Sequence, residues 1–298
     1  MQSILITGGS GFIGSYLVPR LQSSGKTVSV IGRKISSNFS SFKWDIDKKT
    51  IDSKCLDGIG TIIHLSGAGI ADKRWTTNYK KEILESRINS SALLFETLKS
   101  VPNTVHTVIS ASAIGYYGDT GNVWVEEDFR GPEDFLGTTC KEWEKSVRQF
   151  EGMGIRVAIL RIGLVLAKNN GVLPALTLPI KYFLGAPLGN GKQYMSWIHI
   201  EDLCRMFDFV IDNKKMHGVY NAVAPGPVTN KIFTKQIAKI IHRPIWPINV
   251  PSFLLKLILG EKAAIVLRGQ RVSSEKIRMA GFNFLHNDLE NTLKLLLI

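Results

Sequence analysis

The sequence predicts an α/β protein built on a doubly wound parallel sheet, and two observations support this prediction. In the first half of the chain, short apolar segments alternate with longer segments of helical periodicity, which indicates βαβ units. A glycine-rich turn at residues 8–14 joins the first apolar segment to the first helical one. Because crossovers between parallel strands are right-handed, helices should then cover both faces of the sheet.

The strands of this sheet follow from short apolar runs. We expect them at residues 3–7, 27–31, 41–44, 61–65, 104–110 and 155–162, with later strands at 197–200 and 219–222. Helices are expected from the glycine-rich turn to residue 24, over 78–99, from near Pro132, and over 201–211. Strands that alternate with helices in this way form a Rossmann-type fold.

The turn between the first strand and the first helix has the spacing of a dinucleotide site. Gly8 lets the chain turn out of the strand, Gly11 lets the backbone approach a pyrophosphate, and Gly14 lets the helix pack on the sheet. The N-terminus of the helix offers unpaired N–H groups to phosphates. The turn residues expected to bind the cofactor are Gly8, Ser10, Gly11, Phe12, Ile13 and Gly14.

The end of the second strand indicates which dinucleotide binds. An NAD site usually has Asp or Glu there, to hold the ribose hydroxyls. This strand ends in Gly32, Arg33 and Lys34, with two cations and no acid. Arg33 can hold a 2′-phosphate with its planar guanidinium. The sequence therefore favours NADP(H), although both cations could also be simply solvated.

The composition and periodicity of the sequence change after Gly163. Residues 168–197 are rich in Gly and Pro, which favours loops and short helices over a binding cleft, and from Asn230 the pattern is helical. We expect an NADP-binding Rossmann domain of residues 1–167 plus about 198–223. We expect a smaller, mostly helical C-terminal domain on the substrate side, formed by about 168–197 plus 224–298.

Composition excludes several classes of protein. The chain is 44% hydrophobic and 21% charged, as expected for a soluble globular protein. Its three cysteines lack Cys-x-x-Cys spacing, which argues against disulfides and a metal site. The first strand begins almost at Met1, which leaves no room for a signal peptide, and no apolar run is long enough to span a membrane. We expect a cytoplasmic protein.

The net charge of +12 favours anionic ligands. Residues 231–298 contain many cations, but these are spread singly and form no recognised nucleic-acid motif, so a nucleic-acid partner is not expected. The expected partner is a small molecule, and a homodimer stays open.

Several segments resemble the extended short-chain dehydrogenase/reductase superfamily. The start Thr7–Gly14 has that superfamily's glycine pattern, and His64–Ala68 is similar to its loop along the cofactor. Ser110–Gly118 is similar to the stretch that carries its catalytic Ser. Ser196–Leu203 resembles its Phe-Ile-His-Val-Asp-Asp segment, where we expect His199 to be structural.

A closer resemblance is to an atypical branch of this superfamily named epimerase family protein, whose substrate is not generally established. Ser66–Arg87, Cys140–Glu144 and Gly218–Pro225 are similar to segments of that branch. The tail from Ile248, including Gly269–Val272, resembles its own C-terminal domain. The resemblance covers essentially the whole chain.

The resemblance implies further cofactor contacts. Leu65, Ser66 and Gly67 would lie along the cofactor, and Val165 would contact the nicotinamide. Glu82 and Arg87 lie on the following helix, where Arg87 aligns with the superfamily's active-site Asn and could face the cofactor or an anionic substrate. The alternative is that Glu82 and Arg87 form an exposed pair on the helix surface.

The superfamily's catalytic Tyr-x-x-x-Lys pair is missing. The resemblance places the two positions at Leu136 and Cys140; a shift by one residue pairs Gly137 with Lys141, which restores Lys but not Tyr. Ser112 matches the catalytic Ser best, with Ser110 as a second candidate. Tyr116 or Tyr117 could replace the missing acid, and we take Tyr116 as the candidate.

Cys140 is the third catalytic candidate, as a thiol near the cofactor. It shares a helical face with Leu136, Trp143, Val147 and Phe150, so it could instead be a small core residue. A third hypothesis is that Thr139 and Glu142 form a capping box. A helix that begins there would place Cys140 in its first turn, where a thiol pKa falls.

These features predict an NADP(H)-binding protein of the atypical short-chain dehydrogenase/reductase type. The first hypothesis is an oxidoreductase or epimerase that acts on a small polar substrate, in which the cofactor supplies the hydride chemistry. The alternative is a non-catalytic NADP(H)-sensing regulatory or interaction protein, which the missing Tyr supports.

Overall fold

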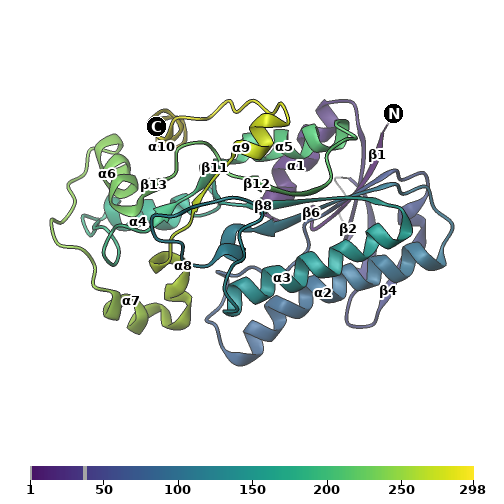
Figure 1. Ribbon diagram of the computed structural model, residues 1–298, viewed down its shortest axis with the longest axis horizontal. Coiled ribbons are helices and arrows are strands. Elements are labelled where there is room, and N and C mark those ends of the chain that lie inside the picture. Colours follow the sequence, from purple (N-terminus) through teal and green to yellow (C-terminus); the bar gives the residue numbers. More distant parts are fainter. Residues whose placement is uncertain (1, 36–38) are drawn as a thin grey trace.

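A computed structural model describes residues 2–35 and 39–298. Its centre is an eight-stranded sheet in the order β12-β8-β6-β5-β1-β2-β3-β4 (Figure 1). Neighbouring strands are parallel except for β3 and β4, which are antiparallel. The strands are β1 (Ser3–Thr7), β2 (Thr27–Gly32), β3 (Ser40–Asp45), β4 (Thr50–Ile51), β5 (Thr61–His64), β6 (Thr107–Ala113), β8 (Arg156–Ile162) and β12 (Gly218–Ala222).

Helices cover both faces of this sheet. α1 (Phe12–Ser23) packs against α5 (Ile200–Asp212), and α2 (Thr77–Ser100) packs against α3 (Phe135–Arg148). Figure 1 shows α2 and α3 together on one side of the strands and α1 and α5 on the other. The central strands are buried along almost their whole length, because helices cover both faces of the sheet. The predicted doubly wound, Rossmann-type fold is confirmed.

A separate group of apolar side chains lies beyond the carboxyl ends of the large sheet. It brings together α4 (Leu173–Lys181), α6 (Asn230–Ile240) and α10 (Leu289–Leu297), around buried residues such as Trp197, Phe233 and Leu293. The remaining helices are α7 (Ser252–Leu259) and α8 (Ala264–Leu267), together with α9 (Glu275–Met279), which packs against β12 of the large sheet. Among the described residues, no helix is both long and apolar enough to cross a membrane.

Short elements connect these parts. Three small sheets pair β9 (Leu164–Leu166) with β11 (Trp197–His199), β10 (Tyr194–Met195) with β13 (Val228–Thr229), and β7 (Trp124–Val125) with β14 (Arg271–Val272). Single 3₁₀ turns occur at η1 (Ser53–Leu56), η2 (Ile114–Tyr117), η3 (Gln149–Met153) and η4 (Gly260–Ala263). The last strand pair joins the C-terminal segment to the loop after β6.

Most predicted boundaries agree with the structure to within a residue or two, and the start of β6 and the start of α3 differ more. The strand expected over 104–110 is β6, Thr107–Ala113, because Asn103 holds a turn before it through bonds from Nδ2 to Leu98 O and Val101 O. The helix expected from near Pro132 begins at Phe135. Its N-cap is Asp134, whose carboxylate accepts a hydrogen bond from Gly137 N at 2.9 Å.

Candidate functional site

The glycine-rich turn lies at the carboxyl end of β1. Gly8 has φ +70°, and its carbonyl accepts a hydrogen bond from Gly11 N at 2.9 Å. Gly11 is the N-cap of α1 and no side chain caps it, so the first N–H groups of α1 stay available to a phosphate. A Cβ at Gly14 would lie 2.5 Å from Gly9 Cα and Gly9 O, which explains why only glycine fits there.

The predicted turn residues are arranged around this helix start. Ser10 and Gly11 are exposed, Phe12 and Ile13 are half-buried, and Gly14 is buried against the turn. The loop after β9 contacts the same place, since a Cβ at Gly171 would lie 3.0 Å from the Phe12 ring and 2.4 Å from Val165 O. The structure therefore brings Val165, predicted to contact the nicotinamide, close to the start of α1.

Two unpaired cations follow β2, as the sequence predicts. Gly32 is half-buried, and Arg33 and Lys34 are exposed. Within the described part of the chain, neither cation forms an ion pair. They are thus free to bind an anion at the carboxyl edge of the sheet.

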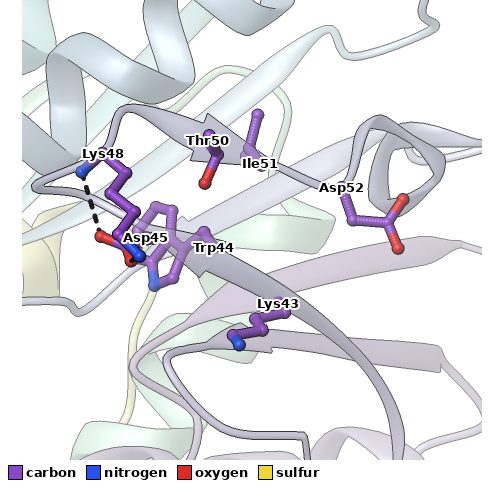
Figure 2. Close-up of a pocket in the computed structure, with 7 residues that line it drawn as sticks. All are labelled: Lys43, Trp44, Asp45, Lys48, Thr50, Ile51 and Asp52. Carbon is purple, nitrogen blue, oxygen red and sulfur yellow. Dashed lines mark hydrogen bonds and ion pairs between the residues drawn. The ribbon is translucent and has the colours of Figure 1, made fainter.

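A hollow of about 370 Å³ lies beside the end of β2, at β3 and β4. Figure 2 shows Lys43, Trp44 and Asp45 along β3 with Thr50 and Ile51 opposite them, and the ion pair of Lys48 with Asp45 at 3.9 Å. Lys43 of β3 lies opposite Gly32 of β2 in the sheet, so the hollow lies at the same edge of the sheet as Arg33 and Lys34.

The loop after β5 is held by Thr7. Its Oγ1 accepts hydrogen bonds from Leu65 N at 3.1 Å and Ser66 N at 3.2 Å, and lies 2.8 Å from His64 Nδ1. Burial lowers the pKa of His64 to about 4, so its ring is neutral at pH 7. This arrangement fixes the predicted cofactor loop Leu65–Gly67 next to Gly8.

Arg87 is buried beneath this loop. Its Nη1 donates to Ala68 O at 3.0 Å and Ile83 O at 2.7 Å, and its guanidinium lies 4.8 Å from the centre of the Trp143 ring. A Cβ at Gly67 would lie 3.0 Å from Arg87 Cζ, so the glycine makes room for the guanidinium. No described residue accepts a hydrogen bond from Nε or Nη2, and both stay available to a ligand.

Glu82 does not pair with Arg87. It is half-exposed and its carboxylate lies 3.2 Å from Lys73 Nζ. The hypothesis of an exposed Glu82–Arg87 pair on α2 is therefore wrong. The Arg87 side chain lies on the buried face of the helix, whereas Glu82 faces the solvent.

Ser112 belongs to a buried cluster of charged and polar groups. Its hydroxyl donates to Glu144 Oε1 at 2.8 Å, and Arg161 holds both oxygens of that carboxylate, through Nε at 2.8 Å and Nη2 at 2.9 Å. Burial alone would lower the pKa of Arg161, but the hydrogen bonds and charge of Glu144 outweigh it and raise that pKa. The Ser112 hydroxyl must rotate away from Glu144 before it can donate to a substrate.

The two tyrosines after β6 differ in their surroundings. Tyr116 is half-buried, and its ring stacks on the Arg161 guanidinium, 3.4 Å from Cζ to the ring centre. Tyr117 is buried, accepts from Arg161 Nη1 at 3.0 Å and donates to Asn221 Oδ1 at 2.6 Å. Burial raises the pKa of Tyr117 to about 12, so it keeps its proton at pH 7. Of the two, Tyr116 is the one whose hydroxyl forms no hydrogen bond with a described residue.

Cys140 lies in the second turn of α3, not in its first. The capping-box hypothesis is wrong because Asp134 caps the helix five residues before Thr139. Cys140 is 5% exposed, and burial, with a smaller contribution from Glu144, raises the pKa of its thiol to about 12. On the predicted helical face, Cys140, Trp143, Val147 and Phe150 are buried, and Leu136 is partly buried.

Sequence reasoning missed Glu144 and the role of Arg161. Both are nearly fully buried charges, and Arg161 lies in the buried part of β8, where its neighbours from Val157 to Ile162 are apolar. A cation in the buried part of a strand requires a buried acid as its partner. The presence of Arg161 in the sequence of this strand could therefore have indicated that such an acid exists. Only the packing of α3 on β6 and β8 shows that the acid is Glu144.

One group of potential metal ligands occurs in the described residues. Atoms of His199, Glu201 and His286 lie within 4.8 Å of one another. His199 Nδ1 accepts a hydrogen bond from Glu201 N at 3.2 Å, so Nε2 carries the proton and has no lone pair for a metal. The geometry of this neutral His199 does not suit a ligand.

Comparisons with known proteins show which family the chain resembles. The model of the NAD dependent epimerase/dehydratase family matches residues 4–222, and a domain of unknown function (DUF1731) matches residues 250–296. An epimerase family protein of Staphylococcus aureus (strain MRSA252) is 36% identical over 301 residues, which cover 99% of this chain and 98% of that protein.

Solved structures are also similar. The crystal structure of human epimerase family protein SDR39U1 (isoform 2) with NADPH has a TM-score of 0.88 and 28% identity, over 99% of both chains. A nucleoside-diphosphate sugar epimerase from Corynebacterium glutamicum has a TM-score of 0.80 and 30% identity, over 98% of this chain and 57% of that one. The resemblance to epimerase family proteins with their own C-terminal domain is confirmed. This chain belongs to the NAD dependent epimerase/dehydratase family.

Proposed function

We propose that this protein binds NADP(H) across the carboxyl edge of its sheet and acts as an oxidoreductase or epimerase on a small polar substrate. The observation that carries the proposal is the uncapped start of α1 behind the Gly8–Gly14 turn, together with Arg33 and Lys34 and no acid at the end of β2. The similar human protein was crystallised with NADPH, which supports the same cofactor here.

The residues present fit such a cofactor. The turn would hold the pyrophosphate through backbone N–H groups, and Arg33 would hold the 2′-phosphate. Leu65–Gly67 and Val165 would line its path, and the free guanidinium N–H groups of Arg87 would donate to the cofactor or to an anionic substrate. When bound, the cofactor supplies or accepts a hydride.

Within this proposal, Ser112 and Tyr116 act on the substrate. The Ser112 hydroxyl orients a substrate oxygen once it turns from Glu144, and Tyr116 exchanges a proton with that oxygen. Stacking on the Arg161 guanidinium holds the Tyr116 ring in place beside Ser112's partner Glu144. Cys140 lines the site but does not act as a base, because a thiol with a pKa of about 12 stays protonated at neutral pH.

A second candidate function is non-catalytic NADP(H) sensing. Leu136 and Cys140 replace the Tyr and Lys of the superfamily, and the Ser112 hydroxyl already has an acceptor in Glu144. The same cofactor site would then regulate contact with a partner.

Binding is tested first, by NADPH and NADH fluorescence titration. The variant Arg33→Ala should weaken NADPH binding roughly tenfold to a hundredfold, because a charge-assisted hydrogen bond is lost, and should leave NADH binding nearly unchanged. Arg148→Ala, at an exposed Arg of α3, is the matched control. Equal losses for both nucleotides would contradict the 2′-phosphate role.

Catalysis is tested separately, with a panel of nucleotide sugars and small carbonyl compounds. We expect turnover with NADPH or NADP⁺ on at least one substrate, and a lower kcat in both Ser112→Ala and Tyr116→Phe with NADPH affinity unchanged. Tight NADPH binding without any turnover would replace the enzyme proposal with the sensor.

A further inference from the structure

Exposed apolar side chains are concentrated on α7 and on two segments beside it. Half of the large apolar side chains that are exposed in the described part of the chain lie in residues 178–184 and 246–258, which we call the apolar rim. Single exposed apolar residues are normal on a protein surface, but a contiguous group of them marks an interaction site.

The apolar face of α7 points away from the protein. Phe253 and Leu257 are 73% and 72% exposed, and Ile258 is 64% exposed, whereas Leu255 is the buried side chain of this helix. Positions 253, 254, 257 and 258 lie within about 140° of the helix circumference, so they form one stripe. A helix at the surface of a globular protein normally turns such a stripe towards the core.

The other two segments of the rim lie side by side. Five of their apolar side chains are more than half exposed: Tyr182, Phe183, Leu184, Trp246 and Ile248. Trp246 N donates to Gly185 O and Trp246 Nε1 donates to Phe183 O, both at 2.8 Å. These bonds fix the two exposed aromatic residues next to each other.

The same strip of backbone leads directly into α7. Val250 N donates to Pro187 O at 2.8 Å, and Gly189 N donates to Val250 O at 2.9 Å. A Cβ at Gly189 would lie 3.3 Å from Ser252 Oγ, in the first residue of α7. Figure 1 shows α7 and the segment before it at the outer edge of the molecule, away from the large sheet. The three parts of the rim are therefore continuous.

The rim is large for a surface without a partner. Tyr182, Phe183, Trp246 and Phe253 are each more than half exposed. Aromatic side chains of this exposure together give roughly 300–500 Å², which equals the largest apolar patch of a typical monomer before any aliphatic residue is added.

The charge around the rim has a single sign. Residues 168–197 and 224–260 contain eight Lys and Arg residues and no Asp or Glu. Lys181 and Lys256 lie within the rim and are exposed, and the Arg243 guanidinium lies 5.0 Å from the centre of the Phe183 ring. The acid that follows α7, Glu261, lies 2.7 Å from Lys80 Nζ and so does not offset these cations.

We propose that the apolar rim docks on the surface of an anionic lipid bilayer. Apolar and aromatic side chains would enter the boundary between headgroups and acyl chains, and the cations beside them would contact the negatively charged headgroups. Trp is favoured at this boundary because its ring is apolar and its N–H is polar. Such contact with one leaflet requires no membrane-spanning helix.

The charge pattern favours a bilayer over a second copy of this chain. In a symmetric dimer the same patch occurs on both subunits. Two apolar rims in contact would bring the cations of both copies together without any acid from these segments, and their repulsion would oppose association. An anionic bilayer instead complements both properties of the rim.

The first test locates the contact through tryptophan fluorescence. The full-length protein is mixed with vesicles of phosphatidylcholine that contain about one third phosphatidylglycerol, with bromine on the acyl chains as a quencher. Trp246 and Trp124 are the exposed tryptophans of the described chain, at 58% and 49%. We expect Trp246→Phe to remove most of the quenching and Trp124→Phe, the matched control outside the rim, to retain it.

The second test measures affinity by vesicle sedimentation. Phe253→Ser and Leu257→Ser should each weaken binding at least about tenfold, because each removes a large apolar side chain from the contact. Met279→Ser, at an apolar residue of α9 that is 80% exposed, is the matched control and should change nothing. Circular dichroism and the melting temperature show that each variant folds.

The role of charge is tested with the same vesicles. Lys181→Gln and Lys256→Gln should each weaken binding about fivefold, and vesicles of pure phosphatidylcholine should bind much more weakly than the anionic ones. Lys214→Gln, at an exposed Lys after α5, is the control for charge and should have no effect.

Three results would overturn the proposal. The first is the absence of binding to anionic vesicles, or equal binding to anionic and neutral ones. The second is quenching that persists in Trp246→Phe. The third is a dimer in light scattering that Phe253→Ser converts to a monomer, because a second copy would then cover the rim.

Discussion

The buried pair of Glu144 and Arg161 provides a sharp test of the structure. Both side chains are 5% exposed or less, and Glu144 accepts three hydrogen bonds, two of them from Arg161. Glu144→Met removes the counter-charge and leaves a guanidinium in the protein interior. Loss of one partner of a buried pair costs about 3–5 kcal/mol of the free energy of unfolding.

We expect the lower end of this range, about 3 kcal/mol, because Arg161 keeps other partners. Its Nη1 still donates to Tyr117 Oη and Glu127 O, and its guanidinium still stacks on Tyr116. Arg161→Met should cost at least as much, since it leaves the carboxylate unpaired. The double variant with Met at both positions should lie within about 1 kcal/mol of the wild type, because neither charge is left unpaired.

Urea denaturation followed by circular dichroism measures these free energies, and the double-mutant cycle isolates the coupling. The exposed pair Lys73–Glu82 is the control, where Glu82→Gln should change stability by less than about 1 kcal/mol. The reasoning fails if Glu144→Met costs less than about 1 kcal/mol, or if the double variant loses the sum of the two single losses.

Three further predictions concern the cofactor edge. Gly14→Ala should abolish NADPH binding measured by fluorescence, because its Cβ would lie 2.5 Å from backbone atoms of Gly9; unchanged affinity would contradict the tight turn. Gly67→Ala should displace the Arg87 guanidinium, because the added Cβ would lie 3.0 Å from Arg87 Cζ. The effects of Gly67→Ala and Arg87→Ala on kcat or NADPH affinity should therefore not add, and additive effects would show that the contact is unimportant. The pKa of His64 is lowered from 6.5 to about 4, so stability should be full above pH 6.5 and fall by about 3 kcal/mol as the pH drops to 4. Urea midpoints across this range should show a shallower fall in His64→Gln than in the wild type, and identical slopes would refute the assignment.

Local sequence determined the outline of the fold. The order of strands and helices, the turn at Gly8–Gly14 and the cations after β2 follow from periodicity and from residues adjacent in the chain. Boundaries were less certain where a side chain decides them. α3 begins at Phe135 because the Asp134 carboxylate is placed to cap it, although Thr139 and Glu142 have the same capping pattern.

Tertiary structure decided which groups meet in the candidate site. Ser112 and Arg161 are in different strands, and Glu144 joins them from a helix 32 residues beyond Ser112.

The glycine turn could therefore be predicted from the sequence alone, because the backbone conformation and the helix N–H groups depend on neighbouring residues. The partners of buried polar groups could not be predicted in this way, because packing between elements distant in sequence determines which groups meet. The sequence thus determined an α/β fold with a dinucleotide turn and a missing Tyr-x-x-x-Lys pair. Only the tertiary structure showed that the Ser112 hydroxyl is held by Glu144 and that the thiol of Cys140 is buried.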